Sequence, residues 1–93
     1  MGDAGKQGQA WWDRFQVLLD DQNDWPADYT FKFIAPRARL EELKAAFGQV
    51  ELSVRESRRG NYLSVTAVMR MHSSDEVVAM YQAAGSVEGV ISL

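Results

Sequence analysis

The sequence predicts an α+β sandwich in which two helices cover one face of a four-stranded antiparallel sheet. Two runs at residues 50–57 and 62–71 alternate apolar and polar side chains on either side of a glycine-containing turn, which is typical of a β-hairpin. An aromatic run at residues 28–35 alternates in the same way. Segments 37–47 and 74–85 have helical spacing of apolar residues, so the predicted order is β-α-β-β-α-β.

The composition indicates one soluble domain. Ninety-three residues with 46% hydrophobic content can fill a single core. The absence of cysteine excludes disulfides, thiolate metal sites and a cysteine nucleophile. No apolar run approaches the roughly 18 residues of a membrane span, and no signal-peptide apolar region is present. We therefore expect a cytoplasmic protein without membrane association, and the net charge of −3 does not suggest a nucleic-acid surface.

The first 24 residues are expected to lie outside the main domain. Residues 1–9 are glycine-rich and polar, which predicts a disordered tail, and residues 10–24 are predicted to form an N-terminal helix. Trp11, Trp12 and Phe15 lie on adjacent helical stripes. Because tryptophan is favoured at binding hot spots, this helix is a candidate for binding a partner. Alternatively it docks on the domain itself, since large exposed apolar patches are uncommon on monomers.

The strand at 28–35 should present its aromatic side to the core: Tyr29, Phe31, Phe33 and Ala35. Pro36 suits the first position of the helix predicted at 37–47, which ends before Gly48. Leu40, Leu43 and Phe47 form its inner stripe, and its charged residues, Arg37 and Arg39 included, are expected to point away.

The hairpin register follows from the requirement that both apolar sets face the same side. This condition is met when Leu52 lies opposite Ala67 and Val54 opposite Val65, with all four facing the core. The connection is then the two-residue loop 59–60 or the wider loop 58–61. A two-residue type I′ turn needs a positive φ at an arginine, so we favour the wider loop with Gly60 or Asn61 left-handed.

The second helix opens with a capping box made by Ser73 and Glu76. Its inner stripe is Val77, Met80, Tyr81 and Ala84. The last strand is predicted at residues 90–93, with Ile91 and Leu93 inward and Ser92 outward. Right-handed crossovers then give the sheet order 4-1-3-2. Residues 25–93 are thus predicted to form a ferredoxin-like βαββαβ sandwich, with both helices on one face and the N-terminal helix as an addition.

The other face of the sheet is open. RNA binding on such a face needs two or three aromatic rings, and only Tyr62 among the strand aromatics is expected there, so RNA binding is a weaker alternative. The face is either solvated or covered by a second copy in a homodimer.

A cluster of polar residues at the turn of the hairpin is a candidate binding site for an anion, which guanidinium groups and turn amides would bind. Its residues are Ser57, Arg58, Arg59, Gly60, Asn61 and Tyr62. Alternatively it is an exposed basic turn that keeps the hairpin soluble. His72 is the single histidine and lies at a strand-to-helix junction, where a solvated role is the simpler interpretation. No phosphate-binding glycine loop, nucleophile motif or metal-ligand cluster is present, so we expect no catalysis, metal or cofactor.

Three segments resemble the YbeD-like family of small bacterial proteins of unknown function: WPADYTFKFI at 25–34, SRRGNYLSVT at 57–66 and VEGVISL at 87–93. The resemblance implies a ferredoxin-like fold similar to regulatory ACT-type domains and brings no established activity. The leading hypothesis is therefore a non-catalytic regulatory or binding domain that binds a small metabolite or a protein partner. A protein-interaction role for the tryptophan-bearing helix is the alternative.

Overall fold

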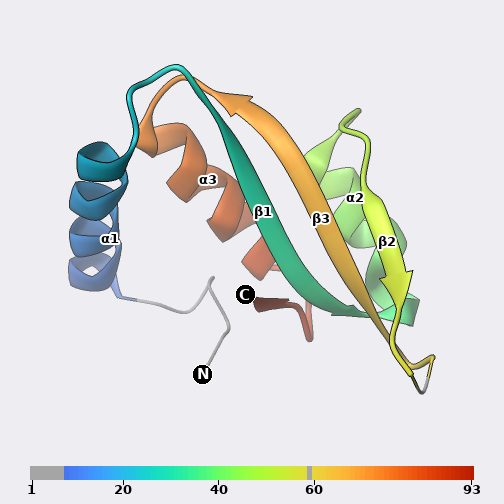
Figure 1. Ribbon diagram of the computed structural model, residues 1–93. Helices are drawn as coiled ribbons and strands as arrows, with labels where there is room; N and C mark the ends of the chain where they lie inside the picture. The colour runs from blue at the N-terminus through green and yellow to red at the C-terminus, as the bar shows by residue number, and fades with distance from the viewer. Residues whose placement is uncertain (1–7, 59) are drawn as a thin grey trace.

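The computed structural model describes residues 8–58 and 60–93, which form an α+β fold with a four-stranded antiparallel sheet (Figure 1). The elements in chain order are α1 (Gln9–Gln22), β1 (Ala27–Pro36), the 3-10 turn η2 (Arg37–Arg39), α2 (Leu40–Phe47), β2 (Ser53–Glu56), β3 (Tyr62–Met71), α3 (Ser74–Gly85) and β4 (Ile91–Ser92). Of the predicted tail, residues 1–7 lie outside the described part, and Gln9 already belongs to α1.

The sheet has the order β2-β3-β1-β4, which is the predicted order 4-1-3-2 read from the opposite edge. The two central strands, β1 and β3, pair over their full length, from Ala27 opposite Met71 to Pro36 opposite Tyr62. β2 and β4 are much shorter and form the edges. The long central pair therefore carries the sheet, and its two sides define a covered face and an open face.

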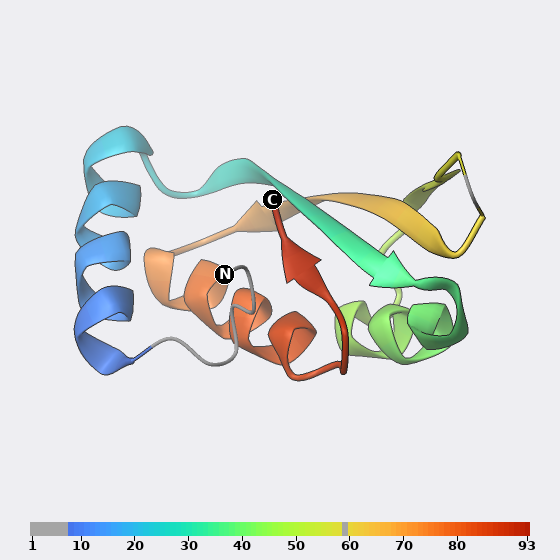
Figure 2. The same ribbon diagram turned by 90° about the horizontal axis from the view of Figure 1, so that it is seen from below.

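The covered face holds the core. Helices α2 and α3 both lie on this side of the sheet (Figure 2). Phe31 and Phe33 of β1 are fully buried, as are Val65 of β3, Leu43 of α2 and Val77 of α3. The predicted inner faces of these elements are confirmed. Their burial is the main driving force for closing the helices onto the sheet.

Helix α1 crosses the end of the sheet and packs on α3 (Figures 1 and 2). Trp12 and Leu19 are buried, and the Phe15 ring meets Tyr81 edge-on with centroids 5.6 Å apart. Gln16 Nε2 donates to Ser74 Oγ at 3.1 Å, which adds a polar contact between the helices. The buried side of α1 is therefore docked on the domain itself, which is the second of the two interpretations of this helix.

The hairpin has the predicted register, with Val54 opposite Val65. Ser57 N donates to Tyr62 O and Gly60 N donates to Ser57 O, both at 3.0 Å, and Gly60 has a φ of 75°. These bonds correspond to the wider loop with a left-handed Gly60. Val54 lies on the covered side with its partner Val65, as predicted, but its side chain is 41% exposed and is not part of the core. β2 pairs over only four residues at the edge of the sheet, so the helix layer leaves Val54 uncovered.

The predicted helix at 37–47 starts differently. Its first three residues form the 3-10 turn η2, and the α-helix begins only at Leu40. Pro36 is the last residue of β1 and keeps an extended ψ of 139°. Arg37 N donates to Asn61 O at 3.0 Å, so the first residue after the strand is still tied to the hairpin.

The predicted orientation of the last strand is also wrong. Phe33 pairs with Ser92 and Ile34 with Ile91. Paired residues share a face, so Ser92 lies on the covered side with Phe33, and Ile91 lies on the open side with Ile34. Val90 is buried, whereas Ile91 and Leu93 are 43% and 67% exposed. This correction adds two aliphatic side chains to the open face.

Candidate functional site

The predicted turn residues surround a shallow hollow of about 390 Å³ on the surface. Ile34, Ser57, Arg58, Asn61 and Tyr62 line it. Ile34 and Tyr62 alternate with the buried Phe33 and Leu63, so the hollow lies on the open face, at the hairpin end of the sheet. Four of the six predicted site residues are thus brought together, Gly60 shapes the loop beside them, and Arg59 lies outside the described residues.

The floor of the hollow is apolar and comes from the two central strands. Tyr62 pairs with Pro36, and Ser64 pairs with Ile34, so Tyr62 and Ile34 are diagonal neighbours on the open face. Tyr62 is 48% exposed, and Ile34 is partly buried. Ile34 was not among the predicted site residues, although the alternation of its strand puts it on the open face. The predicted sheet order made β1 and β3 neighbours, but the register between them, which brings the two residues together, was not predicted.

The wall of the hollow is the hairpin loop, and Arg37 holds this loop in place. Arg37 Nε donates to Gly60 O at 2.7 Å, and Arg37 Nη2 lies 3.0 Å from Glu56 Oε2. Together with the backbone bond to Asn61, these contacts tie Arg37 to the loop at two points and to the end of β2 at a third. Arg37 is exposed and points away from the inner stripe of the helix, as predicted, but it also contacts the hairpin, which was not predicted. The helical pattern did not indicate this role, because η2 turns the residue toward the hairpin.

Unpaired positive charge borders the hollow. Within the described part of the chain, Arg58 makes no ion pair, and neither do Lys32 and Arg55, which lie on the open face of β1 and β2. Arg70, at the far end of the same face, is paired with Asp28 at 3.5 Å. The open face therefore has a neutralised end and a cationic end, and the hollow lies at the cationic end.

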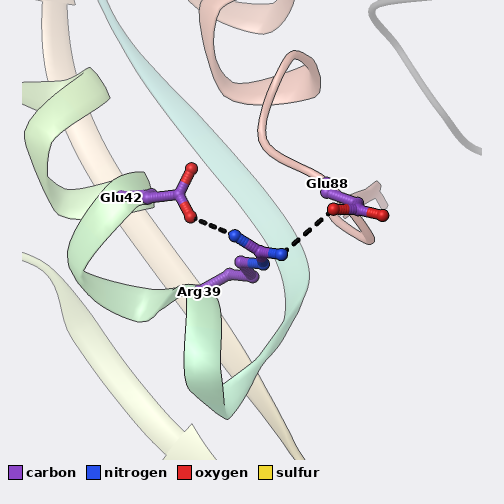
Figure 3. A network of polar contacts seen from close by, with 3 residues as sticks. All are labelled: Arg39, Glu42 and Glu88. Carbon is purple, nitrogen blue, oxygen red and sulfur yellow. Dashed lines mark hydrogen bonds and ion pairs between the residues drawn. The ribbon is translucent and has the colours of Figure 1, made fainter.

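A second polar cluster joins η2, α2 and the loop before β4 (Figure 3). Arg39 reaches Glu42 with one nitrogen and Glu88 with another, the second at 3.0 Å. The hydrogen bond and charge of Glu42, with a smaller effect of Glu88, raise the pKa of Arg39. Gly89, next in the chain, has a φ of 81° and lies against Pro36, where an added Cβ would come within 2.7 Å of Cγ. The cluster has two carboxylates for one guanidinium, so it offers no free positive charge, and it ties η2 to α2 and to the loop before β4.

The surroundings of His72 are those of a helix cap. Its backbone nitrogen donates to Glu76 Oε1 at 2.8 Å, and this bond is the main cause of a lowered Glu76 pKa. Glu76 N in turn donates to Ser73 Oγ at 3.3 Å. The predicted capping box is present, with Glu76 bonding to His72 rather than to Ser73. The His72 ring is exposed, 3.4 Å from the same carboxylate, and the described residues contain no group of side chains suited to a metal ion.

The three aromatic residues predicted as a partner site on α1 are divided by the structure. Trp12 is buried and Phe15 partly buried against α3, whereas Trp11 is 39% exposed beside Phe15 at a centroid distance of 5.3 Å. The ring of Phe15 contacts Tyr81, which belongs to a group of packed aromatic rings. The Tyr81 hydroxyl is 3.2 Å from that of Tyr29. Burial is the main cause that raises the pKa of Tyr81, followed by the bond to Tyr29. Trp12 and Phe15 therefore attach the helix to the domain, whereas a partner-binding role for the exposed Trp11 stays a prediction.

None of the described helices has the length and apolar character that crossing a membrane requires.

Comparisons with known proteins indicate the family of this chain. A family model described as a protein of unknown function (DUF493) matches residues 20–93, so the match begins inside α1. UPF0250 protein IL0958 of Idiomarina loihiensis is 30% identical over 82 residues, covering 81% of this chain and 93% of that protein. No solved structure matches. The expected resemblance is confirmed, and the chain belongs to the DUF493 family, which includes the UPF0250 and YbeD-like proteins.

Proposed function

We propose that this chain is a non-catalytic regulatory domain that binds a small metabolite or a segment of a protein partner in the hollow at the hairpin end of the open face. The observation that carries the proposal is the convergence of the hairpin loop on Ile34 and Tyr62. The loop is held by Arg37, so the hollow is pre-formed. Pre-formed concave sites with apolar walls and a few polar groups are the usual places for small ligands.

The arrangement of the sheet and helices supports a comparison with ferredoxin-like, ACT-type regulatory domains. Both connecting helices lie on one side, and the strand neighbours are those of a βαββαβ sandwich. Fold alone does not carry a function, so the proposal depends on the hollow and its residues.

A thermal-shift screen against amino acids and organic acids tests the proposal. A ligand that binds only the folded state stabilises it by about 2.7 kcal/mol at a concentration 100 times its Kd. We expect at least one compound to raise the Tm of the wild-type chain, and we expect Tyr62→Ala to lose this response. Val68→Ala is the matched control, because Val68 is 58% exposed on the same strand and face but lies outside the hollow. A screen without any shift contradicts small-metabolite binding.

The open face also supports a second candidate function, self-association. Val68, Ile91 and Leu93 are 58%, 43% and 67% exposed on this face. Burial of apolar area of this kind stabilises homodimers. Light scattering coupled to size-exclusion chromatography tests this candidate over a concentration series. A dimer that Ile91→Asp converts to a monomer supports it, and a monomer at every concentration excludes it.

A further inference from the structure

We infer that the hollow binds the carboxylate of a small organic acid whose body is apolar or aromatic. This inference rests on the proposed binding function and narrows the ligand to one chemical class. It follows from the difference between the two arginines at the hairpin, from the charge of the open face, and from the apolar floor of the hollow.

The two arginines next to the loop have different surroundings. The guanidinium of Arg37 is bound to Gly60 O and Glu56, and these contacts position the loop. Arg58 lines the hollow, yet its guanidinium makes no ion pair or hydrogen bond with the described residues. A guanidinium presents a planar fork of donors that matches a carboxylate with two parallel hydrogen bonds. Among the described residues that line the hollow, Arg58 is therefore the cationic group available for an anion.

The charge around the hollow also favours an anion. Arg55 pairs across β2 and β3 with Ser64, which pairs with Ile34 in the next strand, so Arg55 lies one strand away from the floor of the hollow. Lys32 lies two residues along β1 from Ile34. Neither has an acidic partner in the described part of the chain. This local surplus is notable in a chain with a net charge of −3, and a cationic surface raises the local concentration of anions.

The remaining lining residues suit the rest of such a ligand. Tyr62 offers a half-exposed ring and Ile34 an aliphatic surface on which an apolar or aromatic group can pack. The side chains of Ser57 and Asn61 have no hydrogen-bond partner among the described residues and supply donors beside Arg58. The volume of about 390 Å³ falls within the usual range of roughly 300–1,000 Å³ for small-ligand sites.

The test is a nuclear magnetic resonance titration of the full chain with two matched probes, 3-phenylpropanoate and 3-phenylpropanamide, which differ only in the charged group. We expect the acid to give saturable shifts of the backbone amides of Ile34, Ser57, Asn61 and Tyr62. The amide should bind about tenfold more weakly, because it lacks the charge-assisted hydrogen bonds to Arg58. Affinity for the acid should fall as ionic strength rises.

Two arginine variants show whether the effect is local. Arg58→Gln should weaken binding of 3-phenylpropanoate about tenfold, the loss expected for one charged hydrogen-bonding partner. Arg70→Gln removes the same charge from the same face, but Arg70 is paired with Asp28 and lies far from the hollow. It should leave the affinity unchanged. An equal loss in both variants means general attraction of anions and overturns the assignment to the hollow.

The outcomes separate this inference from the proposed function. If the amide binds at the same residues as tightly as the acid, the carboxylate assignment is overturned while binding in the hollow stands. If neither probe shifts those amides, the inference is overturned, and the thermal-shift screen decides the proposed function by itself.

Discussion

The two faces of the sheet are built from the same strands and have opposite properties. In β1, Phe31 and Phe33 are fully buried on the covered face, while Lys32 between them is exposed on the open face. In β3, Val65 and Ala67 are buried and Val68 is 58% exposed. The covered face has two helices over it, and within the described part of the chain no helix lies over the open face.

The difference between the two faces indicates that the covered face determines the stability of the fold and that the open face is available for binding. A residue that touches core atoms on every side contributes to the free energy of unfolding, whereas a solvated residue contributes little. The open face can therefore carry a binding site whose residues change without loss of the fold. Substitutions that compare matched positions on the two faces and at the two ends of the molecule test this separation.

The largest expected effect is on the covered face. Phe31→Ala removes a fully buried ring that contacts Phe47 and Tyr81, with centroids 6.2 and 5.0 Å away, and should lower the free energy of unfolding by about 3–5 kcal/mol. Val68→Ala on the open face should change it by less than about 0.5 kcal/mol. Urea denaturation measures both. Similar losses for the two variants would break the comparison between faces.

The next effect distinguishes two neighbouring tryptophans on α1. Trp12 is 3% exposed and Trp11 39% exposed. Trp12→Ala should cost about 3 kcal/mol, near the lower end for a buried aromatic residue, because α1 lies at the edge of the core. Trp11→Ala should cost clearly less. If Trp11→Ala proves the more damaging in thermal denaturation, the docking of α1 is not as described.

A third comparison concerns two glycines with positive φ. Gly89→Ala should cost about 2 kcal/mol, because a left-handed residue with a Cβ costs roughly 1–2 kcal/mol and the new atom also meets Pro36 Cγ at 2.7 Å. Gly60→Ala has a similar φ of 75° but meets only Arg37 Nη2 at an ordinary 3.8 Å. Calorimetry should therefore show the larger fall in Tm for Gly89→Ala, and equal falls would exclude the contact with Pro36.

A smaller effect is expected at the start of α3. Ser73→Ala removes the acceptor of the Glu76 N–H and should cost about 1 kcal/mol, a typical value for an N-cap. Ser73→Asp keeps an acceptor and should retain the stability. Chemical denaturation of the two variants measures the cap, and a neutral Ser73→Ala would show that the bond contributes nothing.

The smallest effect is a pH dependence from Glu76. Its pKa is lowered in the folded chain from the ordinary 4.5, chiefly by the backbone bond from His72. A lowered pKa stabilises the folded state above pH 4.5, and this contribution is lost as the pH falls through the folded-state value. Glu76→Gln should keep a hydrogen-bond acceptor but lose this part of the acid dependence. Denaturation curves from pH 7 to pH 3 measure the difference, and parallel curves for the two proteins would contradict the shift.

The sequence by itself determined the elements whose patterns repeat many times. Alternation over ten residues in β1 and in β3 identified their covered faces, and the hairpin register followed because a one-residue shift exposes every apolar side chain. The capping box marked the start of α3, because its bonds join residues that are close in the chain. The strand neighbours followed from the handedness of two crossovers. The turn residues of the hollow were singled out by their composition.

Tertiary structure alone decided the features that depend on partners distant in the chain. β4 is too short for its own pattern to orient it, and the pairing of Ser92 with Phe33 turned Ile91 and Leu93 to the open face. The exposure of Val54 depends on how far the helices reach over an edge strand. Arg37 became the support of the hairpin loop, and Ile34 the floor of the hollow, only because the end of β1 lies beside the loop. Local patterns encode which side of a strand is apolar, but the contacts that build a site are made between segments that only the folded chain brings together.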